Sequence, residues 1–199
     1  TEFLVIDENA DITLEDIVIS GFKNRVLYNI GNLTVDGCTF VNNTIADSVI
    51  IGSPNSRGNL KIVESGFYDN KVYKIINSRS DTLINESVFE NNTAFDNFVS
   101  INDGNIIDIR SVNSVKVIST EFVENTFEGK GIYVYNCQDV YINVEFYNNT
   151  IYDAISSFDN IYLNIENSIF AGNTFEFAIY SDSRNTLNIS GSTFTNNTS

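Results

Sequence analysis

The feature that most constrains this chain is a phenylalanine that returns with the same neighbours eight times within 199 residues. Its surroundings read GFKNR, TFVNNT, GFYDNK, VFENNT, EFVENT, EFYNNT, IFAGNT and TFTNNT, anchored at Phe22, Phe40, Phe67, Phe89, Phe122, Phe146, Phe170 and Phe194. Three residues later, seven of the eight carry asparagine: Asn43, Asn70, Asn92, Asn125, Asn149, Asn173 and Asn197. Self-similarity with a period of about 20–50 residues is typical of solenoids, propellers and repeat arrays.

Inside each repeat the apolar side chains change face, which predicts corners. In the seventh repeat Leu163 and Ile165 share one parity, whereas Phe170 has the opposite one. A straight strand cannot turn all three inward, because successive side chains point to opposite faces. We therefore expect one corner near Glu166–Asn167. The odd step from Phe170 to Asn173 places a second corner after the phenylalanine.

Three short strands and three corners in 24 residues, the spacing of the last four anchors, describe one coil of a parallel β-helix. We predict an all-β fold, a right-handed parallel β-helix of about eight coils, as one domain over residues 1–199. Equivalent side chains of successive coils would lie about 4.8 Å apart. The phenylalanines would then stack, and the asparagines would bond one another at a corner, where Asn tolerates a left-handed backbone.

The anchors are unevenly spaced. Only 18 residues separate Phe22 from Phe40, which is short for a complete coil. The 27-residue interval after Phe40 contains the turn-rich stretch 52–58, and the 33-residue interval after Phe89 is expected to hold extra residues within 102–113. The third strand of each coil is expected at 48–51, 72–76, 98–101, 131–135, 154–157 and 177–180.

The alternative fold is a leucine-rich-repeat-like solenoid, because Ile165, Phe170 and Asn173 overlay its template. That template has a large aliphatic residue where this repeat has the hydroxyl of Ser168. The second half of the repeat is also β-branched and aromatic, which favours strand. The β-helix is therefore the preferred interpretation.

The composition excludes several kinds of partner. With 26 acidic and 11 basic residues the net charge is −15, so nucleic acid is excluded because phosphate binding requires a basic face. No apolar run of about 18 residues occurs, so no membrane insertion of this segment is expected. The absence of His removes the commonest general base and metal ligand. Thirty Asn and 26 Ile against six Ala favour strands and tight turns.

Three segments, GSTFTNNT, NSIFAGNTFEFAIY and ESVFENNTAF, carry a family resemblance. The pattern S/T-x-F-x-x-N-T followed by an AIY-type strand resembles the F-x-x-N repeats of bacterial polymorphic outer-membrane adhesins. It resembles still more the Asn- and Thr-rich adhesin-like surface proteins of methanogenic archaea, whose fold is a pectin-lyase-like right-handed β-helix. The resemblance spans Phe22 to Ser199. The Gly-Gly-Ala-Ile motif of the bacterial group is absent, and Gly129–Ile132 is its nearest echo.

Many β-helices of this type are polysaccharide lyases or hydrolases, which need clustered carboxylates with Arg, Lys or His alongside. The candidates are Asp103, Asp108 and Arg110 in the long interval, and Asp153 with Asp159. No set of carboxylates is expected to recur at one column of neighbouring coils. These residues are therefore interpreted as solvated turn residues, and no catalytic or cofactor-binding residue is assigned.

The acidic residues that could bind a metal ion are likewise interpreted as solvated. Asp7, Glu8, Asn9 and Asp11 form an acidic cluster near the start. The cluster lacks the spacing of an EF-hand loop and the Gly-rich nonapeptide of a calcium β-roll. We interpret it as a solvated face and assign no metal site.

The two cysteines are expected to be free. Cys38 falls in the column of small residues two places before the anchor, and Cys137 lies three to four coils further on. That separation corresponds to about 14–19 Å, whereas a disulfide needs Cα atoms within about 7 Å. Cys38 is expected to be buried.

The sequon N-x-[ST] occurs eight times, which makes glycosylation of a surface edge an expectation. The candidate acceptors are Asn32, Asn42, Asn85, Asn91, Asn148, Asn188, Asn196 and Asn197. Asn42, Asn91, Asn148 and Asn196 lie two residues after an anchor phenylalanine, at the rim of the same corner.

The sequence and its resemblance favour a non-enzymatic, extracellular cell-surface module, either an adhesin or its stalk. Its partners would be a cell-surface glycan or protein, or neighbouring repeats of the same chain. The chain starts Thr-Glu-Phe without a leader, so we expect a processed chain or an excised piece. Because neither end shows a polar capping repeat, we expect a segment of a longer array, or neighbours that cover its ends. A polysaccharide lyase or hydrolase on the same scaffold is one alternative. A purely structural spacer in a surface sheath or filament is another.

Overall fold

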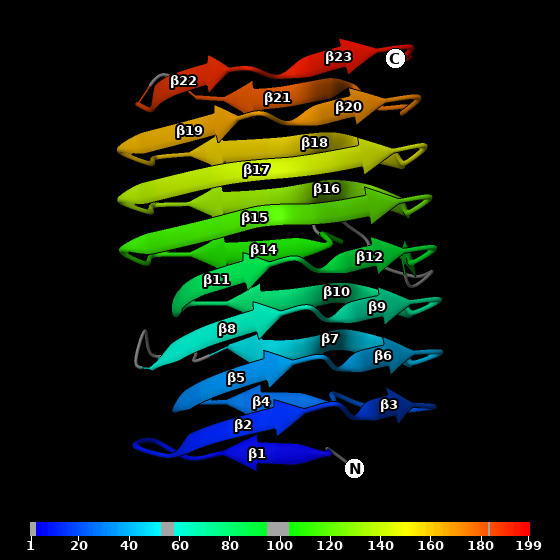
Figure 1. The fold of residues 1–199 in the computed structure, drawn as a ribbon, viewed down its shortest axis with the longest axis vertical. Coiled ribbons are helices and arrows are strands. Elements are labelled where there is room, and N and C mark those ends of the chain that lie inside the picture. The colour runs from blue at the N-terminus through cyan, green and yellow to red at the C-terminus, as the bar shows by residue number, and fades with distance from the viewer. Residues whose placement is uncertain (1–2, 53–57, 95–103, 183) are drawn as a thin grey trace.

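The computed structural model describes residues 3–52, 58–94, 104–182 and 184–199. These residues form 23 β-strands and no helix, wound into a parallel β-solenoid of about seven turns. In Figure 1 the chain runs rightward along the nearer sheet, returns along the farther sheet and climbs with each circuit, so the coil is right-handed. The predicted parallel β-helix is confirmed, with about seven full turns in place of eight. The leucine-rich-repeat-like alternative is disfavoured, because strands occupy all three sides of the coil.

The farther sheet has nine strands and supplies one strand to each coil, except that β13 and β14 belong to the same coil and both pair with β10 and β16. Its members are β1 (Leu4–Ile6), β4 (Leu27–Asn29), β7 (Thr44–Gly52), β10 (Lys71–Ser78), β13 (Thr93–Ala94), β14 (Ile107–Arg110), β16 (Thr126–Tyr135), β18 (Thr150–Phe158) and β21 (Phe177–Ser181). Five of the six predicted third strands fall within these bounds, and the sixth, 98–101, lies outside the described residues.

The nearer sheet has 14 strands in two columns, which meet at the first corner of each coil. The first column contains β2 (Asp11–Glu15), β5 (Asn32–Asp36), β8 (Asn59–Val63), β11 (Asp81–Asn85), β19 (Tyr162–Glu166) and β22 (Thr186–Ser190). The second contains β3 (Val18–Ser20), β6 (Thr39–Val41), β9 (Gly66–Tyr68), β12 (Val88–Glu90), β20 (Ile169–Ala171) and β23 (Thr193–Thr195). Two long strands, β15 (Ser114–Val123) and β17 (Asp139–Tyr147), span both columns.

The corners lie where the change of parity predicts them. Asn167 has a φ of 49° at the first corner, and Gly172 has a φ of 68° at the second. The left-handed residue of the second corner is the one before the ladder asparagine, which corrects the expectation that the ladder asparagine itself adopts this conformation. This position is occupied by Asn42, Asp69, Asn91, Glu124, Asn148, Gly172 and Asn196.

This corner yields a direct prediction for Asn148, whose φ is 53°. Replacing Asn148 by Val should lower the free energy of unfolding by about 1–2 kcal/mol, because a Cβ-branched residue is strained in this region. Replacing it by Gly should leave stability within about 0.5 kcal/mol, since the equivalent Gly172 already serves there. Urea denaturation of the two variants checks the difference. Equal stability of both variants would contradict the assignment of strain.

The ladder asparagines point inward. The first six donate from Nδ2 to Oδ1 of the next asparagine over 2.9–3.0 Å. In all seven, Nδ2 also donates over 2.7–3.2 Å to a backbone carbonyl one coil earlier. All are buried except Asn197, which is partly exposed in the last coil. These bonds satisfy the buried amides, which would otherwise be costly to remove from water.

Beside this ladder runs a column of stacked aromatic rings. Consecutive rings from Phe40 to Phe194 lie 4.4–5.4 Å apart between centroids and are nearly parallel. All but Phe194 are fully buried. Inward-facing Ile, Val and Leu side chains of all three strands complete the core.

Phe22 does not belong to the aromatic column, which corrects the prediction. Ile19 pairs with Phe40, and the N–H of Phe22 donates to Oδ1 of Asn43 over 3.0 Å, as ladder asparagines do in later coils. Phe22 therefore occupies the asparagine position of the first coil, where its ring edge packs on Phe3. The three-residue shift in register explains why the first interval looked too short.

One coil lacks its first corner. The coil is that of β17, and the comparison is with β15 of the coil before it, where Ser119 is the corner residue with a φ of 48°. Strand β17 has no residue that matches Ser119, so it continues without a turn, and the register shifts there so that Thr120 pairs with Val144. For this reason Ile142 points inward and Tyr141 does not, and the branched Val144 stands where the two adjacent coils have Thr120 and Ser168.

The extra residues of the long intervals precede regular strands. Those of the 27-residue interval fall between β7 and β8, as expected, and 53–57 lie outside the described residues. In the 33-residue interval Ala94 and Ile107 both pair with β10, and residues 95–103 between them lie outside the described residues. Within the predicted range 102–113, residues 107–110 form the regular strand β14.

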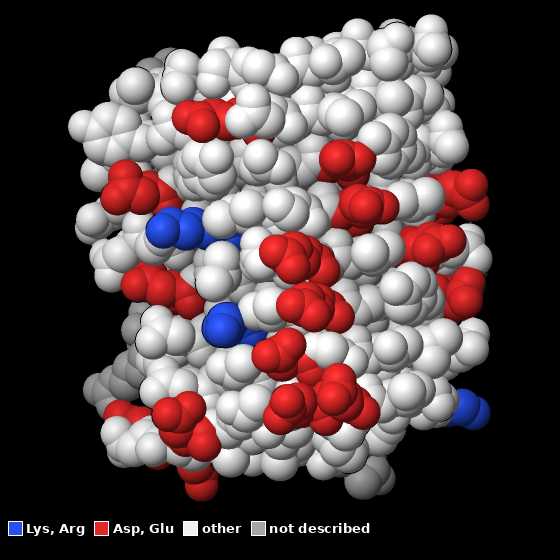
Figure 2. All heavy atoms as spheres, viewed as in Figure 1, with Lys and Arg blue, Asp and Glu red and all other residues white. Residues whose placement is uncertain are grey.

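Charge is unevenly distributed over the surface. Figure 2 shows the face of the 14-stranded sheet, where acidic groups predominate and few basic groups appear. Like-charged carboxylates do meet on neighbouring coils, at Glu15 beside Asp36 and at Glu121 beside Glu145. This corrects the expectation that no such column recurs. These four groups are at least partly exposed, as solvated charges are.

Candidate functional site

The charged, polar and aromatic side chains of the candidate site lie on the outward face of the nine-stranded sheet. Strand register aligns one outward column across β10, β14, β16, β18 and β21, at Asn77, Asp108, Tyr133, Ser156 and Tyr180. At about 4.8 Å per step, this column is about 19 Å long. It is the scaffold of the candidate site.

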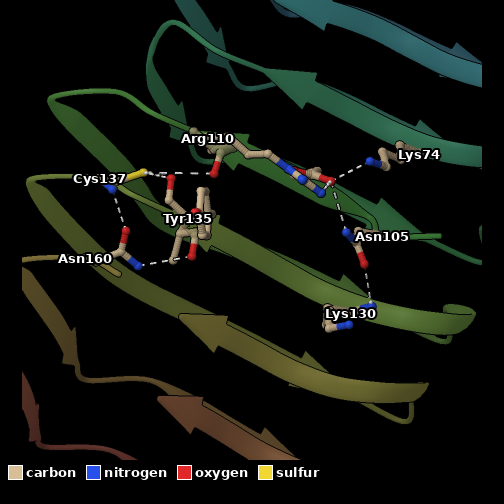
Figure 3. A network of polar contacts seen from close by, with 10 residues as sticks. Lys74, Asn105, Arg110, Lys130, Tyr135, Cys137 and Asn160 are labelled. Atoms are coloured by element: carbon tan, nitrogen blue, oxygen red, sulfur yellow. Dashed lines mark hydrogen bonds and ion pairs between the residues drawn. The ribbon is translucent and has the colours of Figure 1, made fainter. Parts of the chain in front are cut away.

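Asp108 lies at the centre of an ion cluster (Figure 3). Its Oδ2 is 2.5 Å from Nζ of Lys74, and Arg110 binds both carboxylate oxygens, at 2.7 Å from Nε and 2.9 Å from Nη2. Asn105 donates to the same Oδ2 over 3.2 Å and accepts the N–H of Lys130 over 2.9 Å. Asp108 is fully buried, whereas one third of the Arg110 side chain is exposed. The carboxylate therefore holds two cations in fixed positions.

Burial alone would raise the pKa of Asp108. The hydrogen bonds and positive charge of Arg110 and Lys74 outweigh it, so the pKa lies below its usual value. Asp108 is therefore ionised at neutral pH, and its role is to balance charge. A general acid needs the opposite shift.

A polar cleft of about 470 Å³ opens beside this cluster. Its lining includes Tyr73, Lys74, Asn77, Arg79 and Arg110. Of these cations, Lys74 and Arg110 bind the buried carboxylate of Asp108, whereas Arg79 lines the cleft from the adjacent coil.

Asp153 has a different environment. It is 3% exposed, and Ser156 donates to its Oδ2 over 2.6 Å, whereas no side chain of the described residues donates to its Oδ1. Burial raises its pKa, and the neighbouring charge of Glu176 adds to the shift, while Ser156 and Lys130 oppose it. A buried carboxyl of raised pKa beside a second carboxylate is a pairing that acid–base chemistry uses.

An aromatic row continues from the ion cluster toward the C-terminal coils. The guanidinium of Arg110 lies 4.9 Å from the ring centre of Tyr133. From there the ring centroids follow one another at 5.7 Å to Phe158 and 5.1 Å to Tyr180. Phe177 lies 5.7 Å from Tyr180, and both are more than one third exposed. We call Tyr133, Phe158, Tyr180 and Phe177 the aromatic row.

A broader apolar groove, of about 920 Å³, lies along the second corner of the same coils. Exposed threonines line it at one position of three successive coils, Thr126, Thr150 and Thr174, together with Tyr152 and Glu176. Phe177 belongs to both the groove and the aromatic row. The two features therefore form one continuous surface.

The candidate residues from the sequence are only partly brought together. Asp108 and Arg110 meet in the ion cluster, Asp153 lies two coils away, and Asp159 pairs instead with Arg184 over 2.7 Å at a turn. Asp103 lies outside the described residues. Asp108 and Asp153 are buried, which corrects the interpretation of them as solvated turn residues.

The remaining candidates stand apart from this surface. In the described part of the chain no group of three or more Asp, Glu or Cys side chains is arranged to hold a metal ion. Asp7, Glu8, Asn9 and Asp11 are exposed at the first turn. Cys38 and Cys137 are both buried free thiols. Burial raises the pKa of Cys137, whose N–H donates to Oδ1 of Asn160 over 2.6 Å (Figure 3).

The sequon asparagines fall into two groups. Asn42, Asn91, Asn148, Asn188 and Asn196 are exposed. Asn32, Asn85 and Asn197 are partly buried, and the amide of Asn197 belongs to the ladder, where Nδ2 donates to the carbonyl of Phe170 over 2.8 Å. Glycosylation of Asn197 would remove this bond, so its side chain is a poor acceptor site.

Sequence reasoning missed Lys74, the aromatic row and a second short asparagine column. Asn160 accepts the N–H of Cys137, and Asn185 accepts that of Asn160 over 2.7 Å. The aromatic row could have been predicted from the sequence, because Tyr133 and Tyr180 occupy matching outward positions in the third strands. The roles of Lys74 and Arg79 could not, because only the pairing of β10 with β14 brings these residues beside Arg110.

Fold and site together define a parallel β-solenoid with an ion cluster, a polar cleft and an aromatic row on one face. No family model, curated protein or solved structure matches the chain. None of the described residues forms a helix long and apolar enough to cross a membrane.

Proposed function

We propose that this chain is a non-enzymatic cell-surface module, an adhesin or its stalk, that attaches to a glycan. The observation that carries the proposal is the aromatic row beside the polar cleft on one face of a stiff solenoid. Aromatic faces pack on the apolar faces of sugar rings, while neighbouring polar groups orient a ligand by hydrogen bonds. The resemblance to adhesin-like surface proteins points in the same direction.

An extracellular, cell-surface location belongs to the same proposal. Five sequon asparagines are exposed, and four of them, Asn42, Asn91, Asn148 and Asn196, repeat at the second corner. A glycan at each would line one edge of the solenoid and leave the face of the nine-stranded sheet accessible. The acidic remainder of the surface keeps such modules soluble and mutually repelling.

A glycan array tests attachment, and Tyr180→Ala tests the surface involved. Removing the Tyr180 ring from the row should weaken binding about five- to tenfold, because one aromatic contact contributes about 1 kcal/mol. The matched control is Tyr162→Ala, since Tyr162 is half exposed but lies on β19 of the opposite sheet. An equal loss in both variants would count against the row, and no binding to any glycan would favour the spacer alternative.

A polysaccharide hydrolase is the second candidate, favoured by Asp153 alone. Its raised pKa and the neighbouring Glu176 suit a general acid beside a second carboxylate. Release of reducing sugar that disappears in Asp153→Asn would establish this function. The absence of turnover on neutral and acidic polysaccharides would eliminate it.

A further inference from the structure

Three buried side chains of the ion cluster bring together an amine, an amide and a carboxylate. They are Lys74 of β10, Asn105 just before β14 and Asp108 within β14, and each is at most 7% exposed. Nζ of Lys74 lies 2.5 Å from Oδ2 of Asp108, and Nδ2 of Asn105 donates to the same Oδ2 over 3.2 Å (Figure 3). One carboxylate oxygen therefore contacts both the amine nitrogen and the amide nitrogen.

The carbonyl group of the Asn105 side chain is held as well. Its Oδ1 accepts the backbone N–H of Lys130, on the next coil, over 2.9 Å. A backbone N–H in this position stabilises the negative charge that develops on a carbonyl oxygen when a nucleophile adds to its carbon. The amide therefore has a hydrogen-bond donor at its oxygen and a carboxylate at its nitrogen, and both help a nucleophile to replace that nitrogen.

We infer that Nζ of Lys74 attacks Cγ of Asn105 and that the two side chains become joined by an amide bond within the folded chain. Asp108 is ionised, so its Oδ2 can take a proton from the Lys74 ammonium and free the electron pair of Nζ. The Nζ–Cγ bond forms and the Cγ–Nδ2 bond breaks, while Oδ2 passes two protons in turn from Nζ to Nδ2, which leaves as ammonium. Asp108 ends ionised, and no oxidant, reductant or further reactant takes part.

Fixed geometry and burial favour this reaction. Arg110 binds both oxygens of Asp108, at 2.7 and 2.9 Å, and so fixes the orientation of the carboxylate that serves the amine and the amide. Groups held in place react without the entropic cost of meeting. Water is the competing nucleophile, and burial of the three groups limits its access. The bond forms once in each molecule, so no rapid turnover is needed.

The bond links β10 to the start of β14 on the next coil, across the long interval. It closes a covalent loop over residues 74–105, which restricts the conformations of the unfolded chain as a disulfide does. Both cysteines of this chain are free thiols. The amide would therefore give the solenoid a covalent cross-link that reducing agents do not break.

Mass spectrometry of the intact chain under denaturing conditions tests for the bond. The mass should be lower than that of the sequence by one ammonia. Trypsin does not cleave after an acylated lysine, so the digest should contain one branched peptide that joins 72–79 to 80–110. Lys74→Arg keeps a positive charge beside Asp108 but supplies no nucleophilic amine. This variant should retain its full mass and give only linear peptides, and circular dichroism verifies that it folds.

The matched control is Lys61→Arg, the same substitution at an exposed lysine of β8, which should lose ammonia as the parent does. A folded parent with its full mass would overturn the bond, and so would a loss of ammonia found only in linear peptides. Persistence of the loss in Lys74→Arg, or its absence from Lys61→Arg, would equally contradict the assigned pair. The bond does not depend on glycan attachment, so the glycan array and the mass measurement give independent answers.

Discussion

Replacing Phe122 by Ala should lower the free energy of unfolding by about 3–5 kcal/mol. Phe122 is fully buried, and its ring stacks on Phe89 at 5.0 Å and on Phe146 at 4.4 Å between centroids. The substitution removes both stacking contacts and leaves a cavity that the coils above and below cannot fill, because their own backbones are hydrogen-bonded in register. Urea denaturation followed by tyrosine fluorescence and circular dichroism measures the loss.

The matched control lies in the same column. Phe194→Ala removes an identical side chain that stacks on one side only, on Phe170, and is 45% exposed. Its cost should be about 1 kcal/mol, since little cavity forms at an open end. Similar losses in the two variants would show that stacking in the interior of the column does not stabilise the solenoid.

Replacing Asp108 by Ala should lower the free energy of unfolding by a similar amount, about 3–5 kcal/mol, through a different mechanism. The variant leaves the buried Lys74 ammonium and the fork of Arg110 without their shared carboxylate. Asp108→Asn keeps the volume but not the charge and should lose most of the same stability. The control is Arg184→Ala, which breaks an exposed ion pair and should cost less than about 1 kcal/mol.

The contribution of Asp108 should also depend on pH. The folded protein lowers its pKa, so the stabilisation is complete above the unfolded value, near 3.9, and is lost as the pH falls through the lower folded value. The stability difference between the parent and Asp108→Asn should thus be constant at neutral pH and shrink below about pH 4. A difference that persists unchanged at pH 2 would contradict charge balance as its cause.

The aromatic and asparagine columns could be predicted because both recur in the sequence with the spacing of one coil. The parity of Leu163, Ile165 and Phe170 predicts a corner near Glu166–Asn167 from the sequence alone, and Asn167 is the corner residue in the structure. Prediction failed where a coil departs from this spacing. Phe22 was aligned by its residue type, whereas the backbone places Ile19 in the aromatic column. In β17 the absence of a corner residue shifts the alternation, so Ile142 points inward and Tyr141 does not, although the position of Tyr141 relative to Phe146 is the one at which most repeats have Ile or Val.

The candidate site was much less predictable than the fold. Arg110 and Asp108 are two residues apart and could be proposed together, but Lys74 joins them only through a strand pairing across the long interval. Burial of Asp108 was equally hidden, because its outward parity suggests exposure to solvent. Both facts depend on the pairing of strands from different coils, and neither is local in the sequence.

The last coil differs from all the others in how little of it is covered. Leu187, Ile189 and Phe194 continue the inner columns of Leu163, Ile165 and Phe170, yet each is more than 40% exposed. A layer inside a stack is held by two neighbours, and a layer with one neighbour opens most readily. In a sample that contains residues 1–199 alone, thermal opening should therefore begin at this coil, so that its amide protons exchange fastest and those of the middle coils exchange most slowly.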